Sequence, residues 1–276
     1  MTTTQAVAAP WQGIRPPAAG RAGFADALRS EFTKIRSTRS TYWTLLALVV
    51  VTVGIGAIAS YGTASHAAQV YRPSFDATQL SLGGLYVGQL VIAVLGALTI
   101  TSEYSTRMIG TSLAVQPRRG TLFAAKAVVF GVVSLATGLV ASFGSFFLGQ
   151  ALLSGHHLNV TLSQPNVLRA VIGGALFLTA CGMLAYGLGA ILRHTAGAIT
   201  AAIGLLFVLS ILVNFLPGTW QDHVSKWMPA IAGSQVWVTK ASSEVQFSAW
   251  PGFAVLAGYA VVAITAGLVL FRTRDA

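Results

Sequence analysis

The sequence predicts an all-α, polytopic membrane protein in which an amphipathic interfacial helix precedes six transmembrane helices. Its composition is the first reason: 54% of the 276 residues are hydrophobic and only 9% are charged, whereas soluble domains carry about 25% charged residues. The charged residues also leave six gaps that exceed the ~20 residues a helix needs to cross the hydrocarbon core. Finally, the net charge of +10 suits a membrane protein with basic cytoplasmic loops and does not require a nucleic-acid partner.

The first 40 residues divide into a tail and a helix. Residues 1–22 show no hydrophobic periodicity and predict a flexible cytoplasmic tail. They are too polar for a secretory signal, so the first apolar run should be retained as a span. Residues 23–40 place four apolar side chains on one helical face and most charges elsewhere, which predicts an amphipathic elbow helix in the headgroup plane. These apolar side chains are Phe24, Leu28, Phe32 and Ile35.

Residues 41–276 form the predicted transmembrane domain. The spans are expected at roughly 42–62, 82–102, 122–150, 167–192, 196–216 and 250–271. They should be helices, because a helix satisfies its own backbone hydrogen bonds in lipid and no alternating barrel segments occur. Small residues at helical spacing predict close helix packing. They are Gly84 and Gly88, and the stripe of Gly182, Ala185 and Gly189.

The distribution of basic residues predicts the orientation. If the N-terminus is cytoplasmic, 13 of the 17 Lys and Arg residues lie in cytoplasmic segments. Basic residues concentrate on the cytoplasmic side of membrane proteins. We therefore expect both termini in the cytoplasm, with a cytoplasmic loop at 103–121 and an external segment at 217–249.

The sequence contains none of the motifs that would make this chain an enzyme. It has no phosphate-binding P-loop, no G-x-S-x-G elbow and no H-E-x-x-H helix. Cys181, the single cysteine, cannot form an intramolecular disulfide. His156 and His157 have no carboxylate nearby in sequence, so a metal site there is disfavoured. We expect neither a metal nor a cofactor in this chain.

The predicted span interiors contain neutral polar residues but no ionisable ones, which disfavours an ion-coupled carrier. The neutral residues either line a substrate path or join helices by hydrogen bonds. Both interpretations stay open from sequence alone, and a path of this kind would favour an amphipathic or lipid-like substrate. The candidate path residues are Gln89, Thr99, Ser142, Ser145 and Asn214.

The loop 103–121 is the most informative segment. Glu103 stands where the second span ends, and Pro117, Arg118 and Arg119 precede the third. The intervening Ser105–Val115 can form a short helix with apolar side chains for docking a soluble partner. An ordinary cytoplasmic loop is the alternative, because arginines are expected there in any case.

Three segments resemble the membrane permease subunits of bacterial type-2 ABC exporters, particularly those of actinobacteria. SEFTKIRSTRSTYWTLL is similar to the family's elbow helix and first span, and EYSTRMIGTSLAVQPRRGTLFAAK to its coupling loop. KWMPAIAGSQVW resembles the element between its last two spans. The six-span arrangement agrees, so the resemblance covers nearly the whole chain after residue 22. Many members have a glycine soon after the Glu-Tyr pair, whereas the first one here is Gly110.

The resemblance implies a permease that forms the translocation path and does not hydrolyse ATP itself. Its partners would be two ABC ATPase subunits, which bind ATP and Mg²⁺, and a second permease copy or paralogue. The elbow residues Glu31, Lys34 and Arg36 would lie beside the coupling helix. The residues implied to contact or couple to the ATPase are Glu103, Tyr104, Ser105, Thr106, Arg107, Met108, Ile109, Arg118 and Arg119. Trp220, Trp227 and Trp237 would lie over the outer leaflet and cap the path.

A non-transport membrane anchor or assembly subunit is the main alternative. A self-powered carrier and a membrane enzyme are further ones, which the uncharged spans and the missing catalytic motifs disfavour. Co-purification with an ATPase would distinguish the permease from the anchor.

Overall fold

The computed structural model describes residues 23–66, 75–106, 118–240 and 246–273. All regular structure in these ranges is helical, and six stretches are long and apolar enough to cross a membrane. They are α2 (Arg39–Ala64), α5 (Leu85–Ser105), α7 (Arg119–Ser154), α8 (Val167–Leu192), the run Thr195–Phe215 and α13 (Ala249–Thr273). The predicted all-α, six-span fold class is confirmed, and each predicted span overlaps one of these stretches.

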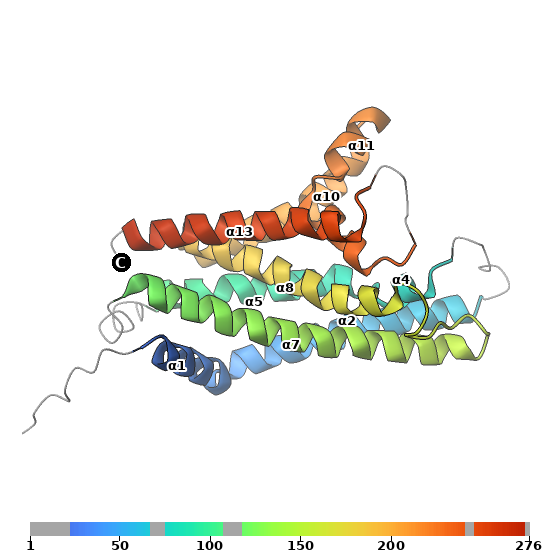
Figure 1. Cartoon of the computed structure of the whole chain (residues 1–276), viewed down its shortest axis with the longest axis horizontal. Helices are drawn as coiled ribbons and strands as arrows, with labels where there is room; N and C mark the ends of the chain where they lie inside the picture. Colours follow the sequence, from blue (N-terminus) through green and yellow to red (C-terminus); the bar gives the residue numbers. More distant parts are fainter. Residues whose placement is uncertain (1–22, 67–74, 107–117, 241–245, 274–276) are drawn as a thin grey trace, which may run out of the picture.

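The spans form an elongated bundle in which α2, α5, α7, α8 and α13 run along the long axis (Figure 1). Helix α8 is at the centre, packed against α5, α7 and α13. Of the most apolar window of α8, 67% is buried, compared with 22% in α2 and in α13. The outer helices therefore present apolar flanks, as expected of helices that face lipid.

Small residues let the central helices approach closely. A Cβ atom added to Gly96 of α5 would overlap the backbone carbonyl oxygen of Gly182 in α8. A Cβ atom added to Gly189 would lie 2.7 Å from the side chain of Ile100 and 3.1 Å from the carbonyl oxygen of Ala97, both in α5. Because apolar association gains little inside a lipid bilayer, such backbone-to-backbone packing is a main source of helix association.

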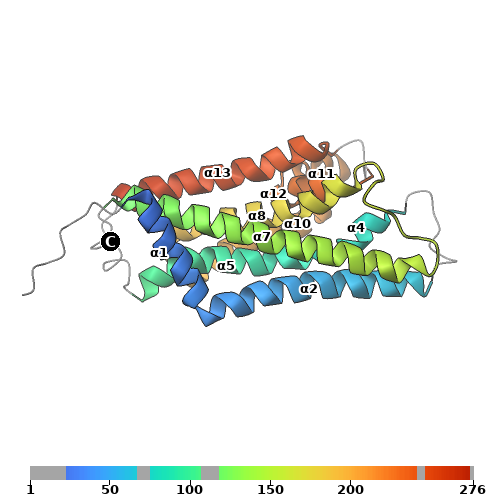
Figure 2. The ribbon, with the colours of Figure 1, turned by 60° about the horizontal axis from the view of Figure 1, so that its bottom comes forward.

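The bundle has two distinct ends. At the elbow end, α1 (Phe24–Ser37) lies across the helices, close to the start of α7 and the last turn of α5 (Figure 2). At the far end, the described residues form three short helices. These are α4 (Ala77–Ser81), α11 (Gly218–Ser225) and α12 (Pro229–Ser234).

The elbow helix packs on the protein through a small, partly charged face. Ala27 and Glu31 of α1 are buried against the bundle, whereas Phe24 and Phe32 are about half exposed. The apolar face predicted from the sequence is therefore divided: Leu28 and Ile35 are partly buried, whereas the two phenylalanines are left uncovered by protein. That arrangement is compatible with a helix that contacts lipid on one side and protein on the other.

The fifth span is irregular. It begins as α9 (Thr195–Ile203), continues as the π-helical turn η1 (Gly204–Val208) and α10 (Leu209–Leu212), and ends in the 3-10 turn η2 (Val213–Phe215). Only α9 packs extensively against α5 and α8. Beyond η1 the span leaves the bundle, and α11 projects from it (Figure 1). The π-helical turn thus marks where the outer half separates from the core.

Candidate functional site

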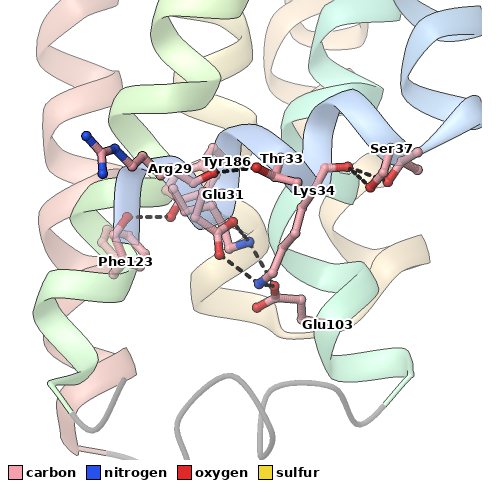
Figure 3. Close-up of polar contacts among 10 residues, drawn as sticks. Arg29, Glu31, Thr33, Lys34, Ser37, Glu103, Phe123 and Tyr186 are labelled. Atoms are coloured by element: carbon pink, nitrogen blue, oxygen red, sulfur yellow. Dashed lines mark hydrogen bonds and ion pairs between the residues drawn. The ribbon is translucent and has the colours of Figure 1, made fainter. Parts of the chain in front are cut away.

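Four charged side chains meet at the elbow end, and we call them the four-charge cluster. Glu31 and Lys34 lie one turn apart on α1, Glu103 lies in the last turn of α5, and Lys126 lies two turns inside α7. Figure 3 shows Lys34 extending from α1 between Glu31 and Glu103. The cluster therefore joins three helices that are distant in sequence.

Each lysine of the cluster bridges both glutamates. Lys34 Nζ lies 2.7 Å from Glu31 Oε1 and 3.0 Å from Glu103 Oε1. Lys126 Nζ lies 2.5 Å from Glu31 Oε2 and 2.9 Å from Glu103 Oε1. The two positive and two negative charges alternate, so the cluster is neutral as a whole.

Burial makes this pairing necessary. Glu31, Glu103 and Lys126 are 2%, 7% and 5% exposed, whereas the Lys34 side chain is 35% exposed. An unpaired charge at such depth is strongly unfavourable, because burial removes the water that would solvate it. Burial lowers the pKa of Lys34, but hydrogen bonds to Glu31 and Glu103 outweigh it and raise this pKa above its usual value. Lys34 therefore stays protonated at neutral pH.

Tyr104 fixes the end of α5 on its other side. Its ring lies 5.1 Å from the guanidinium carbon of Arg193, a cation–π contact. Arg193 ends α8 in a left-handed conformation (φ 53°), and its Nη2 donates to the carbonyl of Leu270 in α13 at 3.0 Å. Glu103 and Tyr104 are thus both turned into the protein and hold the end of α5 to its neighbours.

The other residues implied to contact an ATPase have different positions. Ser105 and Thr106 are exposed at the end of α5, and Arg118 is exposed immediately before α7. Arg119 is the first residue of α7. Arg107, Met108 and Ile109 lie outside the described residues. The elbow residue Arg36 is exposed on α1 and is not part of the cluster.

The candidate path residues separate into two groups. Ser142 and Ser145 are fully buried and join helices: the Ser142 hydroxyl donates to the carbonyl of Val171 at 2.6 Å, and the Ser145 hydroxyl to that of Ser81 at 2.6 Å. Thr99 donates to the carbonyl of Leu95 within its own helix. The helix-joining interpretation therefore accounts for the two serines.

Gln89 and Asn214 line one cavity of about 410 Å³ between α5, the outer half of the fifth span and α12. The cavity lies where the fifth span leaves the bundle, and Gln235 and Gln246 contribute further amide groups to its wall. The Oε1 atom of Gln246 is buried without a hydrogen-bond partner among the described residues. Hydrogen-bonding capacity is thus available inside a cavity that apolar side chains, among them Leu206 and Ile211, also line.

The three tryptophans of the segment 217–249 do not share one environment. Trp220 and Trp227 are 67% and 53% exposed, as expected at a membrane interface. Trp237 is fully buried, with its ring centroid 4.9 Å from that of Tyr86 and 6.2 Å from that of Phe177. The expectation that Trp237 lies over the outer leaflet is therefore wrong, because the chain after α12 folds back onto α8 and buries it.

These features belong to a chain that matches a family model over residues 27–213, the model of the ABC-2 family transporter proteins. The chain belongs to the ABC-2 transporter family. As a member it is a permease-type, multi-pass membrane subunit, distinct from the ABC ATPase subunits with which such permeases work. A comparison with curated proteins finds no match.

The region that matches the ABC-2 family contains the whole four-charge cluster and both ends of the loop 103–121. It ends in the fifth span, so the segment 217–249 and α13 lie outside it. Sequence reasoning identified Glu31, Lys34 and Glu103 but omitted Lys126 from the site. The missed signal was that Lys126 falls just inside the predicted third span 122–150, near its start, where a lysine requires carboxylate partners at the same membrane depth.

The described residues contain no group of three or more His, Cys, Asp or Glu side chains arranged to hold a metal. His156 and His157 are both exposed at the end of α7, and Cys181 is buried in α8. Nothing in this part of the permease therefore offers a metal centre.

At the far end, one carboxylate connects the segment 217–249 to the bundle. Asp76 Oδ1 accepts hydrogen bonds from the backbone N–H groups of Thr78 and Gln79, both at 3.0 Å, and so caps α4. Its Oδ2 accepts from the hydroxyl of Thr239 at 2.5 Å and from two backbone N–H groups, those of Thr239 and Lys240. Asp76 thus holds the chain that follows Trp237 against the entrance of the second span.

Replacing Asp76 with asparagine should destabilise this permease by about 1–3 kcal/mol, because charge-assisted hydrogen bonds are lost from the cap and from the link to Thr239. The free energy of unfolding in mixed detergent micelles would measure the change. Asp222→Asn on α11 is the matched control, since Asp222 is exposed and its side chain has no such set of donors. Equal effects of both substitutions would contradict the anchoring role of Asp76.

Proposed function

We propose that this ABC-2 transporter protein is the membrane permease of an exporter driven by two separate ATPase subunits. It would pair with a second permease copy or a paralogue, with both termini in the bacterial cytoplasm, and ATP and Mg²⁺ would be bound by the ATPases. The observation that carries the proposal is the four-charge cluster, which joins α1, α5 and α7 at the end of the bundle where the loop 103–121 begins and ends.

The cluster supports coupling for a mechanical reason. The loop is held at its start by Glu103 and Tyr104, and at its end by α7, whose Lys126 binds the same Glu103. A force applied to the loop by a partner would therefore act on α1, α5 and α7 together. If one of these helices moved away from the other two, a charged side chain would remain buried without its partner, which is strongly unfavourable. The described exposed residues Ser105, Thr106 and Arg118 remain available for the partner.

The cavity between α5, the fifth span and α12 supports a transport path. Its amide groups, including those of Gln89 and Asn214, could hydrogen-bond an uncharged polar group while Leu206 and Ile211 contact an apolar one. A neutral, amphipathic substrate fits this lining best. We propose that Trp220 and Trp227 lie at the membrane surface near its outer end and that the external segment gates it.

Co-purification in mild detergent tests the proposal. The expected result is that the tagged chain retains an ATPase with a P-loop, and that the complex hydrolyses ATP faster than the ATPase alone. A purified complex that holds no nucleotide-binding subunit would contradict it and would favour the anchor or assembly role.

Substituting Arg118 with glutamate should weaken association with the ATPase about tenfold or more, because it reverses an exposed charge at the end of the loop. The amount of ATPase retained at increasing salt concentration would measure the effect. Lys226→Glu is the control, since Lys226 is a partly exposed basic residue at the end of α11, at the far end of the bundle from the loop. If both variants retain the ATPase as the unmodified chain does, Arg118 has no part in docking.

A further inference from the structure

A pocket of about 360 Å³ lies at the far end, where α8 and α13 both begin (Figure 1). Its walls come from the start of each of these helices and from the chain that follows Trp237. It differs from the cavity beside the fifth span, with which it shares Gln235. The polar and interfacial residues of its lining include Asn166, Arg169, Thr239, Lys240, Ser248 and Trp250.

The described lining of this pocket is positively charged. Arg169 and Lys240 belong to it, and none of its described residues is acidic. The carboxylate of Asp76, which holds the chain at Thr239 and Lys240, already accepts hydrogen bonds at both oxygens. The charge of the lining therefore favours an anionic ligand.

Arg169 is bound by neutral groups alone in the described part of the chain. Its Nη1 donates to the carbonyl of Val236 at 3.4 Å, and its Nη2 to the carbonyl of Val238 at 2.9 Å. A guanidinium has five N–H groups, so three of them have no acceptor among the described residues. A neutral amide could also donate to these carbonyls, so the two bonds do not account for the charge of a partly buried arginine.

Arg169 also lies where a helix disfavours a cation. It is the third residue of α8, and the unpaired N–H groups of a first helical turn carry partial positive charge. Asn166, the residue before α8, makes no side-chain capping bond. The start of α13 adds a second helix end of the same polarity to the pocket. The helix ends thus add to the positive potential of Arg169 and Lys240, and an anion in the pocket would relieve their mutual repulsion.

Aromatic residues place the pocket at the level of the membrane surface. Trp250 lines it and is 57% exposed. Phe247 also lines it, and its ring centroid lies 5.3 Å from that of Trp227, which is 53% exposed. Exposed tryptophans are typical of the headgroup level of a bilayer. An anion can therefore reach the pocket from a lipid headgroup or from the aqueous phase.

We propose that this pocket binds the phosphate group of a phosphate ester. Arg169 donates to the phosphate oxygens with its remaining N–H groups, Lys240 contributes positive charge, and the exposed hydroxyl of Ser248 donates a further bond. These donors approach from α8, from α13 and from the chain after Trp237, which suits a tetrahedral phosphate better than a planar carboxylate. The pocket is larger than a phosphate, so the organic part of the ester has room. The proposal does not depend on the transport role, because binding is measured without an ATPase.

Native mass spectrometry of the full chain in a phosphate-free detergent tests the ligand class. Phosphatidylglycerol is expected to be retained about tenfold more strongly than diacylglycerol, which has the same tails but no phosphate. Binding of glycerol 3-phosphate would show that a free ester suffices, and its failure to bind would identify a lipid as the source. Equal retention of phosphatidylglycerol and diacylglycerol would overturn the proposal, as would equally strong retention of a fatty acid, which offers a carboxylate.

Substitutions at Arg169 separate binding from a structural role. Arg169→Gln keeps donors for the two carbonyls but removes the charge, and it should weaken retention of phosphatidylglycerol about tenfold. Arg169→Lys keeps the charge and should weaken it less. The control, Lys226→Gln, removes a basic residue from the same end but outside the pocket, and should leave retention unchanged.

Two results with these variants would overturn the proposal. One is an equal loss of retention in Arg169→Gln and Lys226→Gln, which would attribute the effect to net charge. The other is an Arg169→Gln protein that melts at a lower temperature but retains phosphatidylglycerol as the unmodified chain does, which would make Arg169 purely structural. If Arg169→Gln fails to fold, Lys240→Gln gives the same test, with an expected loss of about fivefold.

Discussion

Lys126→Ala is expected to destabilise the protein by about 3–5 kcal/mol, the usual result of removing one partner from a buried ion pair. Lys126 is 5% exposed and bridges Glu31 and Glu103. Without it, two buried carboxylates share Lys34 alone, whose side chain is partly exposed, and the repulsion between the carboxylates is no longer balanced. The three helices at the elbow end should separate first, because the cluster is what joins them.

The free energy of unfolding in mixed micelles measures this loss, and two further variants locate its cause. Lys34→Ala should lower the free energy of unfolding by about 1 kcal/mol or less. The Lys34 side chain is 35% exposed, so water already screens its ion pairs with the two glutamates. Glu103→Gln combined with Lys126→Met removes one charge of each sign and should recover more than half of the loss. Equal effects of Lys126→Ala and Lys34→Ala would contradict the assignment of Lys126 as the buried centre of the cluster.

Gly96→Ala should destabilise the bundle by about 1–3 kcal/mol, although it adds a single methyl group. That methyl would overlap the backbone carbonyl oxygen of Gly182, so α5 and α8 must move apart. The atoms that the methyl would meet all belong to the backbone of Gly182, so no side chain can rotate away to make room. Because α8 is the central helix, the displacement also affects its contacts with α7 and α13.

Gly258→Ala provides the matched control for this prediction. Gly258 lies in the middle of α13, and a Cβ there would meet no atom within 4 Å. The same substitution at that site should leave stability unchanged or raise it slightly, because alanine favours the helix. Unfolding in mixed micelles and the fraction of monodisperse protein would compare the two. Similar behaviour of both variants would show that the close approach of α5 and α8 is unimportant.

The six spans could be predicted because they depend on local composition. A run of about 20 apolar residues must become a helix in lipid whatever its neighbours are, since its backbone has no other hydrogen-bond partner there. The elbow helix was predictable for a related reason, its apolar side chains sharing one helical face. The face by which it contacts protein was not predictable, because it consists of Ala27 and Glu31 and contains no large apolar residue.

Other features required the positions of distant segments. The sequence identified Trp237 as an interfacial residue with Trp220 and Trp227, whereas it is buried between α8 and the start of α5. Likewise, Ser145 and Asn214 were equivalent polar residues in predicted spans. One joins three segments inside the bundle, and the other lines a cavity beside a π-helical turn. Their difference follows from where the fifth span leaves the bundle, which no local pattern indicates.

The sequence by itself determined that the chain is a six-span membrane protein, and its motifs indicated the transporter family. Only the tertiary structure decided how the elbow end is held together. Glu31 and Lys126 are 95 residues apart, and Glu103 and Lys126 are separated by 23. Each charge, considered alone, resembles an ordinary cytoplasmic residue at the end of a span. In the fold these charges are brought together in one buried cluster. Because little water reaches them there, each charge must be neutralised by the others.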